Sequence, residues 1–247
     1  MNKVFILGAN SFVGKSLHNL IKKKEKSYLV SKEKINFSDP STFKSINFNN
    51  SIIVDCININ IGNEKNIFDC NVTGFSQFIE YLKNNAVNFK YIYISSISVL
   101  SKESIETSPY VTSKKMAEQF LINSGVNYQI MRLSYPIGKN ENSNRLISRL
   151  IDNLKYNKPI TVNNILINLN NISDVVEAIY REFSKSGIFF ISNNQYVYLK
   201  DIVLFLKDKL NSKSTVEVLE TQNQFQPLSE HPFVSTVGIK STLLQMI

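Results

Sequence analysis

Cysteine and histidine are scarce in this sequence of 247 residues, which contains only two of each. Cys56 and Cys70 cannot build the framework of several disulfides on which small secreted domains depend, so we expect a reducing, cytosolic environment. Adding His18 and His231 still leaves the chain without the spaced cysteine and histidine clusters of zinc sites. We therefore expect no metal centre.

Long hydrophobic runs are also absent. The apolar run at the N-terminus covers only Val4 to Leu7 before it reaches Gly8, which is too short for the core of a signal peptide. No segment approaches the ~20 apolar residues that a membrane-spanning helix needs. The sequence therefore predicts neither a targeting segment nor a membrane partner.

Acidic residues are fewer than basic ones. The chain has 20 aspartates and glutamates and 28 lysines and arginines, which gives a net charge of +8. The lysines are scattered, apart from Lys22 to Lys24, and no aromatic residues alternate with them as they do in single-strand-binding proteins. We interpret this short run as the solvated face of a helix and expect no nucleic-acid partner. A diffuse positive field can still attract a substrate that carries phosphate.

Strand-like and helix-like segments alternate along the chain. Short apolar runs predict strands at 4–7, 28–30, 51–57, 89–94, 128–133 and 187–191. Apolar residues at helical spacing predict helices at 13–25, 71–82 and 113–123. Strict alternation of this kind predicts an α/β fold of the Rossmann type, a doubly wound parallel sheet with helices on both faces.

The alternation changes after Gly138. The pattern there predicts an amphipathic helix at 146–154, strands at 160–162 and 165–169, a helix capped by Ser173 with Asp174 in its first turn, and a last clear helix at 200–210. The tail from Glu220 has no clear pattern. We expect the sheet domain to comprise residues 1–137 plus about 171–193. Residues 138–170 and 194–247 should form a small C-terminal lobe.

The stretch GANSFVG, from Gly8 to Gly14, lies between the first predicted strand and the first predicted helix. In such a unit the first glycine permits a tight turn, a middle glycine lets the backbone approach a diphosphate, and the last allows close helix packing. Ser11 stands where the middle glycine is expected, at the cost of a Cβ atom, but its hydroxyl can itself donate to phosphate. We predict a diphosphate-binding turn made of Gly8, Asn10, Ser11, Phe12, Val13 and Gly14.

The residues after the second strand predict which dinucleotide binds. An Asp or Glu about 20 residues beyond the turn typically binds the ribose 2′-hydroxyl of NAD. This chain has Ser31 and Lys32 there, a hydroxyl and a cation that suit a 2′-phosphate, and Glu33 follows one residue later. We predict NADP(H) as the cofactor, with NAD(H) as the alternative.

A tyrosine followed four residues later by a lysine occurs at Tyr28, Tyr110, Tyr135 and Tyr196. Of these, only Tyr110 follows a proline and opens a predicted helix, where Lys114 shares its face. The preceding strand ends in Ser95 and Ser96, at the sheet edge where open α/β folds bind ligands. The sequence therefore singles out Ser96, Tyr110 and Lys114.

Together these motifs resemble those of the extended short-chain dehydrogenases/reductases, the NAD-dependent epimerase/dehydratase family. The matching stretches, in order, are GANSFVG from Gly8, NVTG from Asn71, YISSISVL from Tyr93, PYVTSKKMAE from Pro109, MRLSYPIG from Met131 and NNISDVVEAI from Asn170. Each is weak alone, whereas their order and spacing are specific. The resemblance covers the chain to about position 205.

The resemblance implies a catalytic set of Ser96, Tyr110 and Lys114. Tyr110 would be the general acid in reduction, Lys114 would stabilise its phenolate and hold the nicotinamide ribose, and Ser96 would bind the substrate oxygen. Lys114, Asn58, Asn71 and Leu133 would contact the cofactor, and Ser96, Ile97, Tyr110 and Tyr135 the substrate. The small C-terminal lobe would be the substrate-binding part.

The absence of residues that other branches of this family use narrows the range of reactions that the resemblance implies. Dehydratases of this family carry an Asp-Glu pair directly after the catalytic hydroxyl residue, where this chain has Ile97 and Ser98. Reductases that also epimerise use a cysteine and a histidine, and neither Cys56 nor Cys70 is placed for that. The expected function is NADP(H)-dependent reduction of a keto group on a nucleotide-linked (deoxy)sugar. Family analogy alone suggests surface polysaccharide biosynthesis.

Two alternatives stay open. A nucleotide-sugar 4-epimerase with retained NAD needs the same three catalytic side chains. A non-catalytic NADP-sensing protein could use the same fold, although such proteins commonly lose the tyrosine or the lysine, and this chain keeps both. The expected partner is a nucleotide-sugar substrate. The sequence does not decide the oligomeric state, and a homodimer is the first assembly to test.

Overall fold

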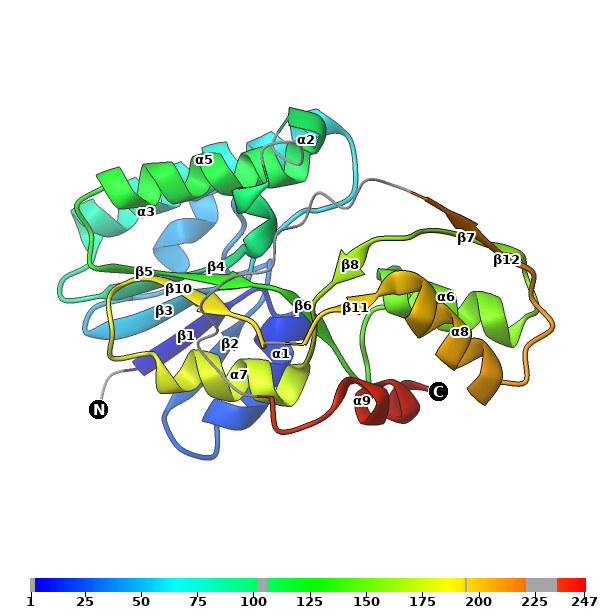
Figure 1. Cartoon of the computed structure of the whole chain (residues 1–247). Coiled ribbons are helices and arrows are strands. Elements are labelled where there is room, and N and C mark those ends of the chain that lie inside the picture. The colour runs from blue at the N-terminus through cyan, green and yellow to red at the C-terminus, as the bar shows by residue number, and fades with distance from the viewer. Residues whose placement is uncertain (1–2, 102–105, 194, 221–234) are drawn as a thin grey trace. The chain divides into compact units, whose positions relative to one another are not determined.

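The structure is a computed structural model of the chain, and it describes residues 3–101, 106–193, 195–220 and 235–247. It divides into two compact units, of which the first comprises Met1–Leu133 and Val176–Phe190. The second comprises Ser134–Val175 and Ile191–Ile247 (Figure 1). The predicted C-terminal lobe includes residues 194 and 221–234, which lie outside the described residues.

The first unit is built on a six-stranded sheet with the order β10-β5-β4-β3-β1-β2. Its strands are β1 (Lys3–Leu7), β2 (Ser27–Val30), β3 (Ser51–Asp55), β4 (Lys90–Ser96), β5 (Tyr128–Leu133) and β10 (Gly187–Ile191). Strand β1 pairs in parallel with β2 and β3, and β3–β4 and β4–β5 are also parallel. The predicted strands are thereby confirmed. In the inner strands β1, β3 and β4, burial explains the apolar residues from which they were predicted.

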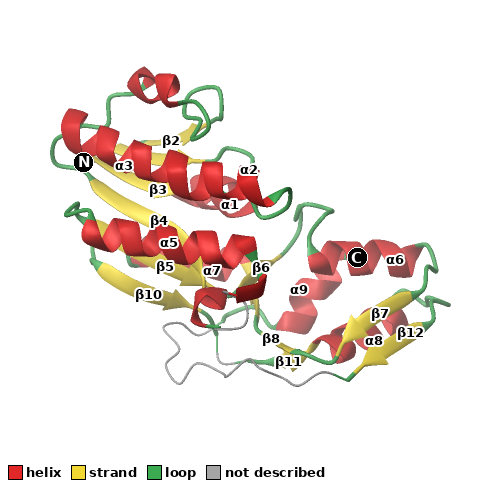
Figure 2. Ribbon diagram, turned by 90° about the horizontal axis from the view of Figure 1, so that it is seen from above, coloured by secondary structure: helices red, strands yellow, loops and turns green. Residues whose placement is uncertain are grey.

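Helices cover both faces of this sheet, as Figures 1 and 2 show. Helices α3 (Phe75–Asn85) and α5 (Pro109–Asn123) lie on one face, and α1 (Phe12–Ile21) and α7 (Ile172–Arg181) on the other. The predicted Rossmann-type fold is therefore confirmed. The chain runs from β1 to β2 on one side of β1, and from β2 it returns to β3 on the other side. The point at which the strand order reverses, the switch point, therefore lies between β1 and β3. Ligands of open α/β sheets bind outside the carboxyl ends of the strands at such a point.

The segment before α3 differs from the prediction of one helix at 71–82. Helix α2 (Glu64–Phe68) leads into a π-helical turn, η2 (Asp69–Gly74), which continues into α3. Asn63 caps α2 by accepting a hydrogen bond from the Asn66 amide over 2.8 Å. Polar residues dominate α2, so the apolar spacing that predicts helices gave no signal there.

Helix α7 begins two residues earlier than predicted. The Oδ1 atom of Asn171 accepts a hydrogen bond from the amide of Ser173 over 2.8 Å, so Asn171 caps the helix and the prediction of Ser173 was wrong. Asp174 does lie in the first turn. Its carboxylate accepts hydrogen bonds from the Ser235 hydroxyl and from the amides of Thr236 and Val237. These contacts fix the chain that leads into the final helix α9 (Ile239–Met246).

The second unit surrounds its own apolar core. Helix α6 (Leu146–Lys155) buries Ile147, Leu150, Ile151 and Leu154 against α8 (Leu199–Lys209) and α9. Strand β7 (Ile160–Asn163) pairs with β12 (Val216–Leu219), β8 (Leu166–Ile167) with β11 (Val197–Tyr198), and β6 (Tyr135–Ile137) with β9 (Leu169–Asn171). Helix α9 was missed in the sequence because it has only two buried apolar residues, Ile239 and Leu243. The described residues contain no helix that is long and apolar enough to cross a membrane.

Asparagines make several of the tight turns. Positive φ values between 49° and 66° occur at Asn50, Asn88, Asn140, Asn157 and Asn211. Asparagine tolerates this left-handed region better than most residues, because its short amide can form local hydrogen bonds. The chain thereby forms such turns with only eight glycines in its sequence.

Candidate functional site

The glycine turn connects the carboxyl end of β1 to the N-terminus of α1. Gly8 has a φ of +86°, and a Cβ atom there would lie 2.9 Å from the backbone carbonyl group of Cys56. A Cβ atom on Gly14 would lie 2.9 Å from the Gly8 carbonyl oxygen. Both glycines are therefore needed, one for its backbone angle and both for close packing.

Ser11 fits this turn without strain. Its φ of −67° is an ordinary value, so the cost that we attached to its Cβ atom does not arise. The Ser11 hydroxyl accepts a hydrogen bond from the Gly14 amide over 3.3 Å and caps α1. This arrangement leaves a helix N-terminus at the switch point, and such a terminus favours anionic groups.

The end of β2 is bound to the same turn, because the Val30 carbonyl accepts hydrogen bonds from the amides of Gly8 and Ala9 over 3.2 and 3.0 Å. Lys32 follows and is exposed. A hydrogen bond from the Ser31 hydroxyl lowers the pKa of Glu33, so this carboxylate is charged at neutral pH. The predicted 2′-phosphate position therefore contains one cation and one anion.

Helix α5 carries two of the three predicted catalytic residues. The Ser108 hydroxyl caps it by accepting from the Val111 amide, and Pro109 occupies the first turn, so Tyr110 and Lys114 lie one turn apart at its start. The helix packs against β4 and against the 3₁₀ turn η3 (Ile97–Leu100) that follows Ser96. All three residues therefore lie on contacting elements of the first unit.

Ser96 and Tyr110 are half-buried, whereas Lys114 is only 3% exposed. The Ser96 and Ser98 hydroxyls lie 2.8 Å apart, and the Ser98 amide donates to the Ser96 hydroxyl over 3.2 Å. Lys114 Nζ donates to the Ile94 carbonyl over 2.8 Å and lies 4.3 Å from the centre of the Tyr93 ring. Burial lowers the pKa of Lys114 to about 8.

Asn71 connects the segment after β3 to helix α5. Its side chain accepts from the Ile59 amide over 2.9 Å and donates to the Ile59 carbonyl over 2.8 Å and to the Ser113 hydroxyl over 3.1 Å. It also lies 3.4 Å from the side-chain oxygen of Asn58. These contacts order the segment beside the glycine turn. The predicted cofactor contacts of Asn58 and Asn71 remain predictions, as does that of Leu133, which is 5% exposed at the end of β5.

Three buried charged residues of the first unit were missed in the sequence. Asp55 at the end of β3 is fully buried, and Glu118 on α5 is paired with Arg132 on β5. A signal for Asp55 did exist, because it is an acidic residue inside the apolar run SIIVDCI. Charged residues are almost never fully buried unless they are paired, so the run itself indicates a partner.

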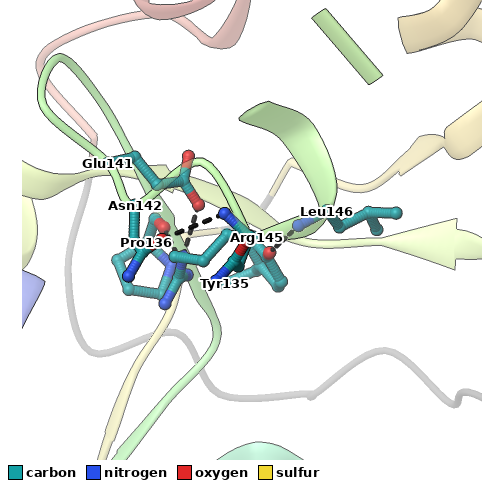
Figure 3. A network of polar contacts seen from close by, with 7 residues as sticks. Tyr135, Pro136, Glu141, Asn142, Arg145 and Leu146 are labelled. Atoms are coloured by element: carbon teal, nitrogen blue, oxygen red, sulfur yellow. Dashed lines mark hydrogen bonds and ion pairs between the residues drawn. The ribbon is translucent and has the colours of Figure 1, made fainter. Parts of the chain in front are cut away.

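Tyr135 and Arg145 form a polar network in the second unit, which Figure 3 shows. The Tyr135 hydroxyl accepts a hydrogen bond from the Leu146 amide over 2.9 Å at the start of α6. The Arg145 guanidinium lies 4.6 Å from the Tyr135 ring centre, donates to the Pro136 carbonyl and pairs with Glu141. Tyr135 thus positions α6, and its predicted contact with substrate remains a prediction. The same holds for Ile97, which is 9% exposed in η3.

A cavity of about 680 Å³ lies within the second unit, between α6 and β7. Its lining includes the charged side chains of Arg149, Asp152 and Lys158 and the aromatic ring of Tyr156. Tyr156 is 73% exposed, and Lys158 Nζ lies 5.8 Å from the centre of its ring. Within the part of the chain that the structure describes, no cluster of three or more histidine, cysteine, aspartate or glutamate side chains could hold a metal ion.

The sequence profile of the NAD dependent epimerase/dehydratase family matches residues 4–187 of this chain. No curated protein matches the chain by sequence. Among solved structures, the *Bordetella bronchiseptica* enzyme WbmH in complex with NAD+ is similar, with a TM-score of 0.83, 15% identity and coverage of 100% of this chain and 97% of that one.

Two further structures resemble the chain. UDP-glucuronic acid 4-epimerase from *Bacillus cereus* in complex with NAD has a TM-score of 0.81 at 18% identity, covering 99% of this chain and 97% of its own. dTDP-4-dehydrorhamnose reductase from *Bacillus anthracis* in complex with NADP has a TM-score of 0.74 at 20% identity, covering 90% and 85%. At these identities the similarity is one of fold.

Proposed function

Because the chain belongs to the NAD dependent epimerase/dehydratase family, we propose that it reduces a keto group on a nucleotide-linked sugar with NADPH. The observation that carries this proposal is the position of Tyr110 and Lys114, one helical turn apart at the start of α5, which packs against η3 beside Ser96. By family analogy the product would enter surface polysaccharide synthesis.

The glycine turn supports dinucleotide binding. Side chains are excluded at Gly8 and Gly14 by backbone atoms 2.9 Å away, while Ser11 caps the helix N-terminus that would receive the diphosphate. Lys32 would bind the 2′-phosphate of NADPH, which is why we favour this cofactor over NADH. The bound cofactor would supply a hydride to the carbonyl carbon of the sugar.

The three side chains would move one proton and stabilise one charge. Tyr110 would donate its phenolic proton to the carbonyl oxygen as the carbonyl carbon accepts the hydride, so ketone becomes alcohol. The ammonium of Lys114 would stabilise the phenolate that remains on Tyr110. Ser96 would donate a hydrogen bond to the carbonyl oxygen while negative charge develops on it.

From the chemistry of its lining we infer that the cavity within the second unit binds a nucleoside diphosphate. Arg149 and Lys158 supply positive charge for phosphate, and the largely exposed Tyr156 side chain supplies an aromatic ring for contact with a base. Asp152 can accept hydrogen bonds from a ribose or a base. On this assignment Arg149→Ala should weaken binding of a nucleoside diphosphate without affecting binding of NADPH, as calorimetry of the two ligands would show.

The proposal is tested by mixing the purified protein with NADPH and several nucleotide-linked 4-keto sugars and following the absorbance of the reduced cofactor. Tyr110→Phe should abolish turnover and leave NADPH binding intact. Tyr28→Phe is the matched control, because Tyr28 begins the same tyrosine–lysine pattern but lies in strand β2. Loss of NADPH binding in Tyr110→Phe would mean that this residue has another role.

The same assay separates the alternatives. Similarity in fold to a UDP-glucuronic acid 4-epimerase favours epimerisation as the second candidate. An epimerase would release sugar with one inverted centre and no net change in cofactor. Tight NADPH binding without oxidation by any of the sugars would instead support a sensor.

A further inference from the structure

Asp55 has no role in the chemistry proposed above, although it is the most unusual ionisable group near it. It is the last residue of β3 and is 0% exposed. The Ile57 amide donates to one carboxylate oxygen and the Tyr91 hydroxyl to the other, each over 2.8 Å. Two donors therefore hold this carboxylate in one orientation, inside a core where an isolated charge is costly.

The strand register places Asp55 and Lys114 in one buried cluster. Asp55 is opposite Tyr93 of β4, and Tyr91 is two residues earlier on that strand, so the three side chains share one face of the sheet. Helix α5 covers this face, and from it the Lys114 ammonium reaches the Tyr93 ring at 4.3 Å and the Ile94 carbonyl at 2.8 Å. The carboxylate and the ammonium thus approach the same strand from β3 and α5.

Within the residues that the structure describes, the other ionisable groups around Lys114 do not balance its charge. They are Cys56 after β3, Tyr91 and Tyr93 on β4, Cys70 on η2, and Tyr110 and Glu118 on α5. Burial raises the pKa of both thiols and of Tyr91 and Tyr93, so these groups are neutral at physiological pH. The carboxylate of Glu118 is bound through both oxygens to Arg132.

Among the described residues, Asp55 is the anion that remains. Burial raises the pKa of its carboxyl to about 6, and the positive charge of Lys114 opposes that rise. Burial likewise lowers the pKa of Lys114 to about 8, and the negative charge of Asp55 opposes that fall. Between these two values both groups are charged, and each stabilises the ionised form of the other.

We propose that Asp55 is the counter-ion of Lys114, and that its carboxylate keeps the ammonium protonated within the core so that Lys114 can stabilise the phenolate of Tyr110. Asp55 is then a positioning residue that acts through Lys114. The catalytic part of this inference rests on the proposed function. The pairing of the two charges does not, and it can be measured without substrate.

The pairing is tested by titrating Lys114 through its ¹³Cε NMR resonance, assigned by its absence in Lys114→Met. In Asp55→Asn the pKa of Lys114 should fall by about one or more, which corresponds to a tenfold or larger change in its protonation equilibrium. In the unsubstituted protein the same resonance should show a second, smaller inflection where Asp55 titrates. An unchanged midpoint in the variant, or a single inflection in the unsubstituted protein, would overturn the proposal. The second measurement does not require the Asp55→Asn variant to fold.

The pH dependence of turnover supplies a readout that a purely structural role would not produce. Asp55→Asn should have nearly full kcat at pH 6, where Lys114 stays protonated, and lose about tenfold by pH 8. Asp69→Asn, which removes an exposed carboxylate paired with Lys65, should follow the unsubstituted protein at every pH. An equal loss at all pH values in Asp55→Asn would contradict the proposal.

The two proposals fail differently. If Lys114 titrates lower in Asp55→Asn but no nucleotide sugar oxidises NADPH, the counter-ion stands and the proposed function fails. If reduction is observed while Lys114 titrates identically in both proteins, the function stands and Asp55 is not the counter-ion.

Discussion

Glu118 on α5 and Arg132 on β5 form a two-point ion pair in the core of the first unit. The Arg132 guanidinium donates to one carboxylate oxygen over 2.6 Å and to the other over 3.0 Å, and the side chains are 0% and 10% exposed. The Ser95 hydroxyl of β4 donates to the same carboxylate over 2.6 Å. The helix that carries Tyr110 and Lys114 is thereby attached to two strands.

Removal of the Glu118 charge should destabilise the fold strongly. Glu118→Gln leaves the Arg132 guanidinium buried without its anion, so the free energy of unfolding should fall by about 3–5 kcal/mol in urea denaturation. Glu80→Gln is the control, because its partner Lys83 lies three residues away on an exposed helix face, and its loss should stay below about 1 kcal/mol. Equal, small losses in both variants would show that the buried pair contributes little.

The crowding of the glycine turn predicts an effect on cofactor binding. Gly14→Ala brings a methyl group to 2.9 Å from the Gly8 carbonyl oxygen, so the turn must open and NADPH affinity should fall by about tenfold or more. Gly238→Ala is its counterpart, since that glycine has an ordinary φ of −61° and no atom within 4 Å of an added Cβ. Fluorescence titration with NADPH measures both variants. Undiminished affinity in Gly14→Ala would argue against this turn as the diphosphate site.

Lys32 should determine the choice between the two nicotinamide cofactors. If it binds the 2′-phosphate, Lys32→Ala should weaken NADPH by about tenfold, or 1.4 kcal/mol, and leave NADH nearly unchanged. Lys34→Ala removes an equally exposed lysine two residues away and should change neither affinity. Parallel losses for both cofactors in Lys32→Ala would mean that the residue does not discriminate between them.

Asp55 should make stability depend on pH in a defined direction. Its pKa rises from 3.8 to about 6 on folding, so the folded chain binds this proton more tightly than the unfolded chain does. The contribution favours folding below pH 3.8 and is lost as the pH rises through the folded value. Relative to Asp55→Asn, the unsubstituted protein should therefore lose about 2 kcal/mol of stability between pH 4 and pH 6. A constant difference between the two proteins across this range would exclude the raised pKa.

Sequence patterns predicted the structure correctly where all the residues that give the pattern lie in a single strand or helix. The strands 128–133 and 187–191 were predicted with the bounds that the structure has. Ile188 to Ile191 form a continuous apolar run, whereas in 128–133 the apolar residues are interrupted by Gln129 and Arg132. The spacing also predicted that Tyr110 and Lys114 lie one turn apart on a single helix, as they do in α5, while their catalytic role stays a prediction.

The sequence patterns gave no prediction for side-chain contacts between residues of different strands and helices. The Glu118–Arg132 pair and the Asp55–Tyr91 contact join elements that become neighbours only through the strand order of the sheet. The cap of α7 was assigned to Ser173 because serine and asparagine are both good caps, and spacing alone does not separate Asn171 from Ser173 two residues later.

The left-handed asparagines have a consequence for how distant turns hold together. The Asn88 amide group donates to the Asn50 side-chain oxygen over 3.0 Å, and Asn157 accepts from the Lys213 amide over 2.6 Å. Glycine at Asn50 or Asn157 would keep the backbone angle but remove these bonds, so these two turns are also cross-links. Loops whose sequences suggest that they tolerate substitution are here joined in pairs by side-chain hydrogen bonds.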